Sequence, residues 1–121
     1  MNEDSYFNKG GRMNTSDNKK YKAYSVTDKK LIITSDINKL LKSKKNYIIL
    51  RPTGIVDEDN NEIYEGDFVE FSLLKLLGDY TAYEVLHSDN KFYLKAVGRK
   101  IIELDKSLNY MLNIVNSRYS N

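Results

Sequence analysis

Only a few residues of this chain have the type and spacing that catalysis would need. His87 is the single histidine, and it stands beside a predicted turn over residues 88–90. A catalytic histidine requires a nucleophile or an orienting carboxylate close to it in space, and the sequence around His87 indicates neither. We therefore interpret His87 as an ordinary residue at the edge of a strand.

The carboxylates Asp57 and Asp59 are the best candidates for a metal site. Oxygen ligands of this kind suit Mg²⁺ or Ca²⁺, but the ligand spacing and final glutamate of an EF-hand are absent. The chain has no cysteine, and therefore no thiolate nucleophile and no zinc–sulfur site. It also has no glycine-rich phosphate loop and no nucleophile elbow. We expect no catalytic residue, no metal and no cofactor, and hence a protein that is not an enzyme.

The size and composition indicate one folded domain. A chain of 121 residues is large enough for a single core, and 40% hydrophobic with 30% charged residues is typical of a globular protein. No apolar run of about 18 residues is present to span a membrane, residues 1–20 lack the apolar segment of a secretory signal, and the lack of cysteine fits the cytoplasm. We expect a polar tail over residues 1–18, with Tyr6 and Phe7 as its anchors to a partner, and one cytoplasmic domain over residues 19–121.

Short strand-like segments separated by turns follow the tail. Short strands at close spacing favour a small antiparallel barrel, so the predicted fold class is mainly β with a short helix. Ser35 is expected to cap the helix, and Pro52 is expected to end strand pairing because it has no N–H to donate. The expected strands cover residues 21–26, 31–34, 46–51, 67–71, 80–86, 91–97, 99–104 and 110–116, and the helix lies within residues 35–45.

The segment TGIVDEDNNEIYEGDFVEF, residues 53–71, is dense in turn residues and acids. A reversal is predicted at DEDNNE, with Asp59 and Asn60 tolerating a positive φ, and a corner is predicted where Gly66 and Asp67 precede a strand with Val69 buried. The segment is thus either a structural corner or an acidic docking patch, and the residues do not exclude both roles. The acids of the patch are Asp57, Glu58, Asp59, Glu62, Glu65, Asp67 and Glu70.

An apolar segment, SLLKLLGD at residues 72–79, has two possible interpretations. If its leucines are exposed, they form an apolar patch of the kind that marks an interface. If they are buried, they belong to the hydrophobic core. The leucines concerned are Leu73, Leu74, Leu76 and Leu77.

Lysines and tyrosines suggest a second kind of surface. Residues 1–50 hold eleven Lys and Arg against five acids, a net charge of +6, whereas residues 51–121 have a net charge of −4. Lysine suits diffuse attraction to phosphates, and the aromatic side chains Tyr80, Tyr83, Phe92 and Tyr93 could stack with bases. Solvated charges and core aromatics explain the same pattern. The candidate nucleic-acid-binding residues are Lys19, Lys20, Lys22, Lys39, Lys42, Lys44, Lys45, Tyr83 and Tyr93.

Residues 53–71 also carry a longer pattern, T-G-(I/L)-x-D-x-(N/D)-(G/N)-x-E-I-Y-E-G-D-(I/F)-V, and resemble in it the YopX family of phage and prophage proteins. Residues 20–32 resemble the family's opening strand, and residues 112–119 weakly resemble its closing segment. This chain departs from the family pattern at Tyr24, Asn60 and Leu112, where the family has tryptophan, glycine and glycine. The residues that match the pattern without a gap are Thr53, Gly54, Asp57, Glu62, Ile63, Tyr64, Glu65, Gly66, Asp67 and Val69.

The resemblance implies an SH3-like β-barrel with some helix attached, a tendency to oligomerise and a phage origin, and it carries over no catalytic residue. The sequence therefore leads to two functional hypotheses. The first is a phage accessory protein in the host bacterial cytoplasm that binds proteins, self-associates and perturbs a host factor such as a defence complex. The alternative is a regulatory protein that binds nucleic acid. Neither hypothesis involves a membrane.

Overall fold

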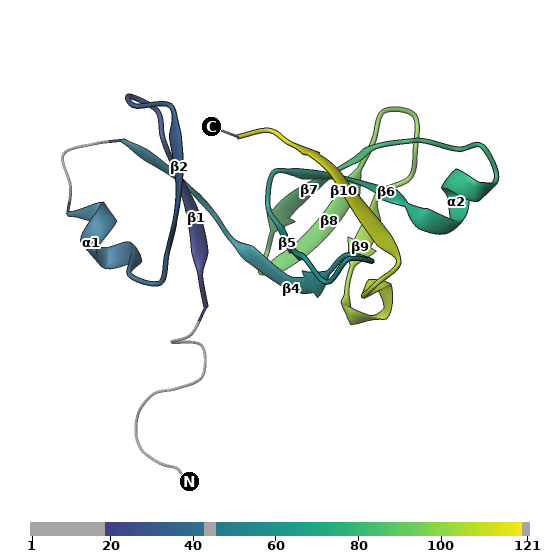
Figure 1. Cartoon of the computed structure of the whole chain (residues 1–121), viewed down its shortest axis with the longest axis horizontal. Helices are drawn as coiled ribbons and strands as arrows, with labels where there is room; N and C mark the ends of the chain where they lie inside the picture. Colours follow the sequence, from purple (N-terminus) through teal and green to yellow (C-terminus); the bar gives the residue numbers. More distant parts are fainter. Residues whose placement is uncertain (1–18, 43–45, 120–121) are drawn as a thin grey trace, which may run out of the picture.

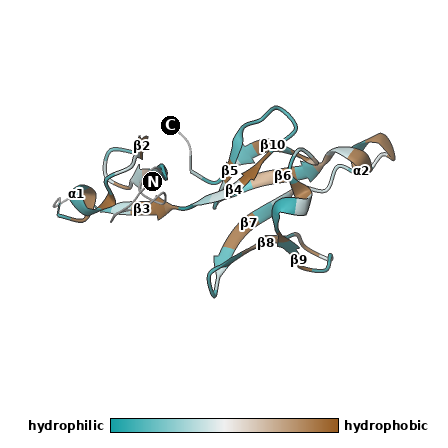
Figure 2. Ribbon diagram, turned by 90° about the horizontal axis from the view of Figure 1, so that it is seen from below, coloured by the Kyte–Doolittle hydropathy of each residue, from teal (hydrophilic) through white to brown (hydrophobic). Residues whose placement is uncertain are grey.

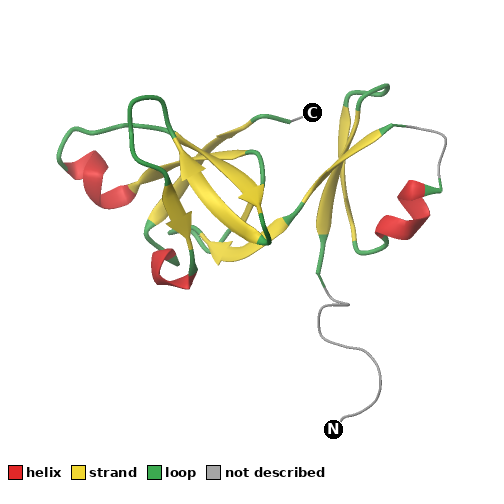
Figure 3. Ribbon diagram, turned by 180° about the vertical axis from the view of Figure 1, so that it is seen from behind, coloured by secondary structure: helices red, strands yellow, loops and turns green. Residues whose placement is uncertain are grey.

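The computed structural model describes residues 19–42 and 46–119. It is mainly β, with 48% strand and 13% helix, and its strands form three antiparallel sheets (Figure 3). The predicted fold class is therefore confirmed, and the open sheets are compatible with a small β fold. The predictions for the tail, including Tyr6 and Phe7, and for Lys44 and Lys45 fall outside the described residues.

The first sheet has three strands in the order β2-β1-β3. A tight turn joins β1 to β2, and Lys29 adopts a positive φ of 56° there. Asp36, and not Ser35, caps helix α1, because the Asp36 carboxylate accepts a hydrogen bond from the Lys39 N–H at 3.1 Å. The elements are β1 (Tyr21–Ser25), β2 (Lys30–Thr34), α1 (Ile37–Leu41) and β3 (Tyr47–Leu50).

The chain passes from β3 into β4 as one extended run, which carries it from the first sheet to the other two (Figure 1). Pro52 does not end the pairing here, since it is the first residue of β4 and lies opposite Tyr64 of β5. A proline is tolerated at this position because the first residue of a strand need not donate to the ladder. The two strands of this sheet are β4 (Pro52–Val56) and β5 (Glu62–Tyr64).

The third sheet has five strands in the order β10-β6-β7-β8-β9. Its β7–β8 hairpin turns at Asp89 and Asn90, which both have a positive φ, as a two-residue hairpin turn requires. Helix α2 (Ser72–Leu76) follows β6 directly, and the 3-10 helix η3 (Lys106–Leu108) precedes β10. The strands are β6 (Asp67–Phe71), β7 (Tyr83–Ser88), β8 (Lys91–Lys95), β9 (Ile102–Leu104) and β10 (Leu112–Ser117).

The core forms between the five-stranded sheet and the β4–β5 pair. Each of the seven strands from β4 to β10 contributes at least one buried side chain to one cluster, so the two sheets share a core. Alternate residues of a strand point to opposite faces, which is why Val69 is fully buried and its neighbour Phe68 is not. The buried cluster consists of Ile55, Ile63, Val69, Tyr83, Val85, Leu94, Leu104 and Leu112.

The predicted reversal between β4 and β5 is present and is built around Asp57. One oxygen of its carboxylate accepts hydrogen bonds from the N–H groups of Asp59 and Asn61, at 3.0 and 2.8 Å. Asn60 has a φ of 65°, whereas Asp59 is not among the residues with a positive φ. The carboxylate thus holds the turn from inside, because it satisfies backbone donors that the strands leave unpaired.

The predicted corner at Gly66 and Asp67 is also present. Gly66 has a φ of 90°, a conformation that a side chain disfavours. The Asp67 carboxylate accepts a hydrogen bond from the Tyr64 N–H at 2.8 Å, and the Gly66 N–H donates to the Val85 carbonyl at 2.9 Å. The corner therefore ties β5 to both β6 and β7.

Side-chain contacts join the first sheet to the rest of the molecule. The Tyr64 hydroxyl donates a hydrogen bond to the Lys20 carbonyl at 2.9 Å, and the Lys22 ammonium lies 4.4 Å from the centre of the Tyr64 ring. On the other side, the rings of Tyr24 and Tyr119 lie 5.3 Å apart. Two tyrosines at the ends of distant strands thus fix the first sheet against the core.

We predict that Asp57→Ala destabilises the protein whereas Asp59→Ala does not. Asp57 is 2% exposed and its loss leaves backbone N–H groups without a partner, at a cost of about 1–3 kcal/mol. Asp59 is exposed in the same turn, so its truncation should change the free energy of unfolding by less than about 0.5 kcal/mol. Urea unfolding of both variants measures the difference, and equal stabilities would contradict the structural role of Asp57.

Candidate functional site

Helix α2 resolves the alternatives for the leucine segment. Leu73, Leu76 and Leu77 are 64%, 82% and 78% exposed, and only Leu74 among the four leucines is partly buried. The helix projects from one end of the molecule (Figure 1), and its ribbon carries hydrophobic residues there (Figure 2). We call Leu73, Leu76 and Leu77 the leucine ridge. It is an exposed apolar surface and not part of the core.

The base of α2 is fixed to the five-stranded sheet. The Ser72 N–H donates to the Met111 carbonyl at 3.1 Å, and the Lys75 ammonium pairs with the Glu70 carboxylate at 3.4 Å. These contacts bind the helix to β6 and to the start of β10. The leucine ridge is therefore held outward on a short helix that is anchored at its base.

The segment after α2 is fixed as well. The Asp79 carboxylate accepts hydrogen bonds from the N–H and hydroxyl of Thr81 and pairs with the Arg99 guanidinium at 3.0 Å. The Thr81 and Arg99 hydrogen bonds hold the pKa of the Asp79 carboxyl down at about 2. Asp79 is therefore ionised at neutral pH and ties the end of the α2 segment to the turn between β8 and β9.

The acidic residues predicted to dock a partner are mostly engaged within the fold. Asp57 and Asp67 are each 2% exposed, so the assignment of both to a docking patch is corrected: Asp57 is a buried turn residue and Asp67 a buried corner residue. The Glu62 carboxylate accepts from the Gly54 N–H at 2.7 Å, and the Glu65 carboxylate pairs with the Arg51 guanidinium at 3.0 Å. A hydrogen bond from the Asn113 amide also engages the Glu58 carboxylate.

Burial changes the pKa values of two side chains at the corner, Asp67 and Tyr64. It raises the pKa of the Asp67 carboxyl, although the hydrogen bond from the Tyr64 N–H and the charge of Lys22 act in the opposite direction. Burial also raises the pKa of the Tyr64 hydroxyl, with smaller contributions from the charges of Glu62 and Asp67. Desolvation disfavours the charged form of both groups, so an ionised Asp67 is a cost to the folded state.

The aromatic side chains do not form the platform that the sequence suggested. Tyr83 is 4% exposed and packs edge-on against Phe71 at 5.4 Å, so the prediction that Tyr83 stacks with bases is wrong. Phe92 and Tyr93 are neighbours on β8 and therefore face opposite sides of the sheet. Because side chains alternate along β8, Phe92 faces the same side of the sheet as the buried Leu94 and packs against the edge of the core.

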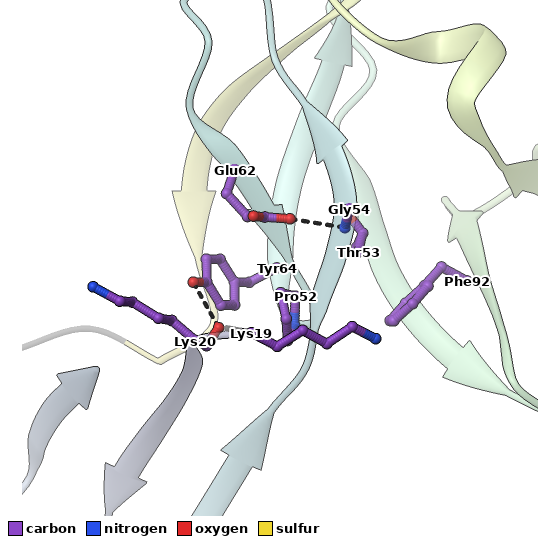
Figure 4. Close-up of a pocket in the computed structure, with 8 residues that line it drawn as sticks. All are labelled: Lys19, Lys20, Pro52, Thr53, Gly54, Glu62, Tyr64 and Phe92. Carbon is purple, nitrogen blue, oxygen red and sulfur yellow. Dashed lines mark hydrogen bonds between the residues drawn. The ribbon is translucent and has the colours of Figure 1, made fainter. Parts of the chain in front are cut away.

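The lysines also separate into two groups. Lys39 and Lys42 lie on or beside α1, which lies next to the first sheet at the end of the molecule away from the five-stranded sheet (Figure 1). Lys19 and Lys20 precede β1 and line a hollow of about 510 Å³ beside the β4–β5 pair (Figure 4). The other residues that line this first hollow are Pro52, Thr53, Gly54, Glu62, Tyr64 and Phe92.

A second hollow of about 390 Å³ adjoins the first, because Lys19, Pro52 and Phe92 line both. Three more basic or aromatic side chains contribute to it, those of Tyr21, Arg51 and His87. His87 lies directly across from Phe92 in the β7–β8 ladder, with ring centres 5.0 Å apart. We call the two hollows together the groove. No single-segment pattern marks it in the sequence, since its residues come from four separate segments.

Comparison of the sequence with known protein families and curated proteins gave no match. No protein-family model matches the chain, and no curated protein matches it significantly. Within residues 19–42 and 46–119, no three metal-ligating side chains gather closely enough to hold an ion, and no helix there is long and apolar enough to cross a membrane.

We predict that Asp67→Asn changes how stability depends on pH. Because the folded-state pKa of Asp67 is raised, its contribution is most favourable below the unfolded-state pKa and is lost as pH rises through the folded-state pKa. Asparagine keeps an oxygen that accepts from the Tyr64 N–H but does not titrate. Wild type should therefore gain stability relative to Asp67→Asn as pH falls from 7 to 4 in urea unfolding. A constant difference over this range would show that burial does not perturb Asp67.

Proposed function

We propose that the protein acts by binding another protein chain and that the leucine ridge of α2 is the contact surface. The observation that carries this proposal is the exposure of three leucines, two on α2 and one directly after it, on a helix anchored at its base. Burying one leucine side chain contributes about 1.5–3 kcal/mol, and apolar side chains gathered on a surface mark interaction sites. An anchored helix also loses little conformational freedom on binding, which favours affinity.

The partner we propose is a second copy of the chain. In a two-fold dimer the same patch of each copy meets its equivalent, so the two ridges would cover one another. The ridge is flanked by one cation and one anion, Lys75 and Glu70, and such a patch does not repel its copy. The tendency of the YopX family to oligomerise, implied by the resemblance, points the same way.

We further propose a non-enzymatic accessory role for this assembly, in the cytoplasm of a bacterial host. The resemblance to phage and prophage proteins supports that setting, and a host factor such as a defence complex is the target it suggests. His87, the single histidine, lies against the ring of Phe92 rather than beside a nucleophile. This placement supports a structural role for His87, although histidine is the side chain that most often acts as an acid or base in catalysis.

We predict that Leu76→Ser/Leu77→Ser abolishes dimer formation without loss of the fold. Each lost leucine contact should weaken association at least about tenfold, while exposed side chains contribute little to the stability of the monomer. Light scattering after size-exclusion chromatography measures the mass of both proteins at micromolar concentration. Ile33→Ser is the matched control, because Ile33 is an aliphatic residue of similar exposure, 62%, on β2.

A monomeric wild type would contradict the self-association. If the wild type is monomeric and binds a protein from a host-cell lysate that the double variant does not bind, the leucine ridge contacts that protein and not a second copy of the chain. If both the variant and the wild type assemble equally, the contact surface lies elsewhere on the molecule.

A further inference from the structure

The groove places an aromatic ring between two hollows. Phe92 is partly exposed and lines both hollows, and Pro52 lies beside it on β4. The volumes of about 510 and 390 Å³ fall within the range of small-ligand sites, about 300–1,000 Å³. A flat ring could therefore lie on Phe92 with room for attached groups on either side.

Basic side chains line both hollows. The side chain of Lys19 extends past Pro52 toward Phe92, and that of Lys20 runs in the opposite direction (Figure 4). No ion pair holds either ammonium among the described residues, whereas Arg51, on the second hollow, shares one guanidinium nitrogen with Glu65. Glu62 is the one carboxylate of the two linings, and its Oε2 accepts from the Gly54 N–H. The groove is therefore net positive.

The backbone that carries the lysines is fixed. The Tyr64 hydroxyl donates to the Lys20 carbonyl at 2.9 Å, and Lys22, two residues on, lies over the same ring. The two ammonium groups thus extend on flexible side chains from an anchored backbone, that of Lys19 toward Phe92 and that of Lys20 away from it (Figure 4). This combination suits a ligand with phosphates at intervals along a chain and planar rings between them.

We propose that the groove binds single-stranded nucleic acid, with one base stacked on Phe92 and the adjacent phosphates on Lys19, Lys20 and Arg51. A duplex keeps its bases stacked inside and offers no free face to Phe92, so single strands are preferred. An acidic peptide would satisfy the cations but would leave Phe92 without a planar partner. Of the aromatic side chains that the sequence suggested for stacking, this site keeps Phe92 and leaves out the buried Tyr83.

This binding is independent of the proposed self-association, because the leucine ridge contributes nothing to the groove. The test uses the full chain and a fluorescein-labelled oligothymidylate of about 10 nucleotides, and anisotropy is measured at increasing salt. Contacts to single-stranded phosphates release counterions, so the logarithm of the affinity should fall with the logarithm of salt by about 0.7 per contact.

Two pairs of variants separate stacking from charge. Phe92→Leu keeps an apolar side chain at the core edge but removes the aromatic face, and it should weaken binding about tenfold. Tyr80→Leu is its control, since Tyr80 is 63% exposed and outside the groove. Lys19→Gln/Lys20→Gln should reduce the salt slope by about 1.4, whereas Lys39→Gln/Lys42→Gln, on α1, should leave it unchanged.

Three outcomes would overturn the proposal. The first is no anisotropy change at low salt for the wild type, and the second is unchanged binding by both groove variants. The third is equal competition by polyglutamate, which would show a site for anions in general and not for nucleic acid. Weaker competition by duplex DNA of the same length would support the stacked base. Thermal unfolding of each variant confirms that the fold is retained, and the lysine variant, whose side chains are exposed, tests the site even if Phe92→Leu unfolds.

Discussion

The hydrogen bond between the Tyr64 N–H and the Asp67 carboxylate is the contact on which the arrangement of the sheets depends. It fixes the corner at which β5 becomes β6, and the same tyrosine extends its hydroxyl to the Lys20 carbonyl. One residue therefore connects the turn of the core to the backbone of the first sheet. Burial raises the pKa of the Asp67 carboxyl, because desolvation disfavours its ionised form. Only an acceptor at this position satisfies the buried Tyr64 donor.

Several residues of the family-like pattern form hydrogen bonds with one another, which gives a physical reason for their occurring together. The Thr53 hydroxyl donates to the Ile63 carbonyl at 2.7 Å, and the Gly54 N–H donates to Glu62. Together with Tyr64 and Asp67, these contacts close the β4–β5 pair. Four of the seven acids of the segment accept hydrogen bonds from backbone N–H groups, namely Asp57, Glu62, Glu65 and Asp67. A structural corner accounts for most of this acidity, and the docking role assigned to Asp57 is not needed.

The features of this fold that depend on residues close together in the sequence were predictable. The corner at Gly66, the positive φ of Asn60 and the first hairpin follow from local turn chemistry, and the strands follow from alternation. Burial was less predictable, because it depends on which face of a strand meets a distant partner. Tyr83 and Asp57 are buried for this reason, although a tyrosine or an aspartate in isolation is expected at the surface. Single residues of the groove, such as Lys19 and Phe92, were candidates from the sequence, but their assembly with Pro52 was not predictable, because four segments distant in sequence line the groove.

The two proposed surfaces lie on different parts of the molecule, and the fold determines their independence. Helix α2 projects beyond the five-stranded sheet (Figure 1), whereas the groove is lined by residues just before β1, on β4 and β5, and at the β7–β8 end of the five-stranded sheet. A dimer joined through the ridges would leave both grooves open, so each copy would present one stacking site. Two linked sites engage one strand with an effective concentration set by their separation. Loss of the ridge should therefore weaken binding to a strand long enough to reach both grooves, and leave binding to a short one unchanged.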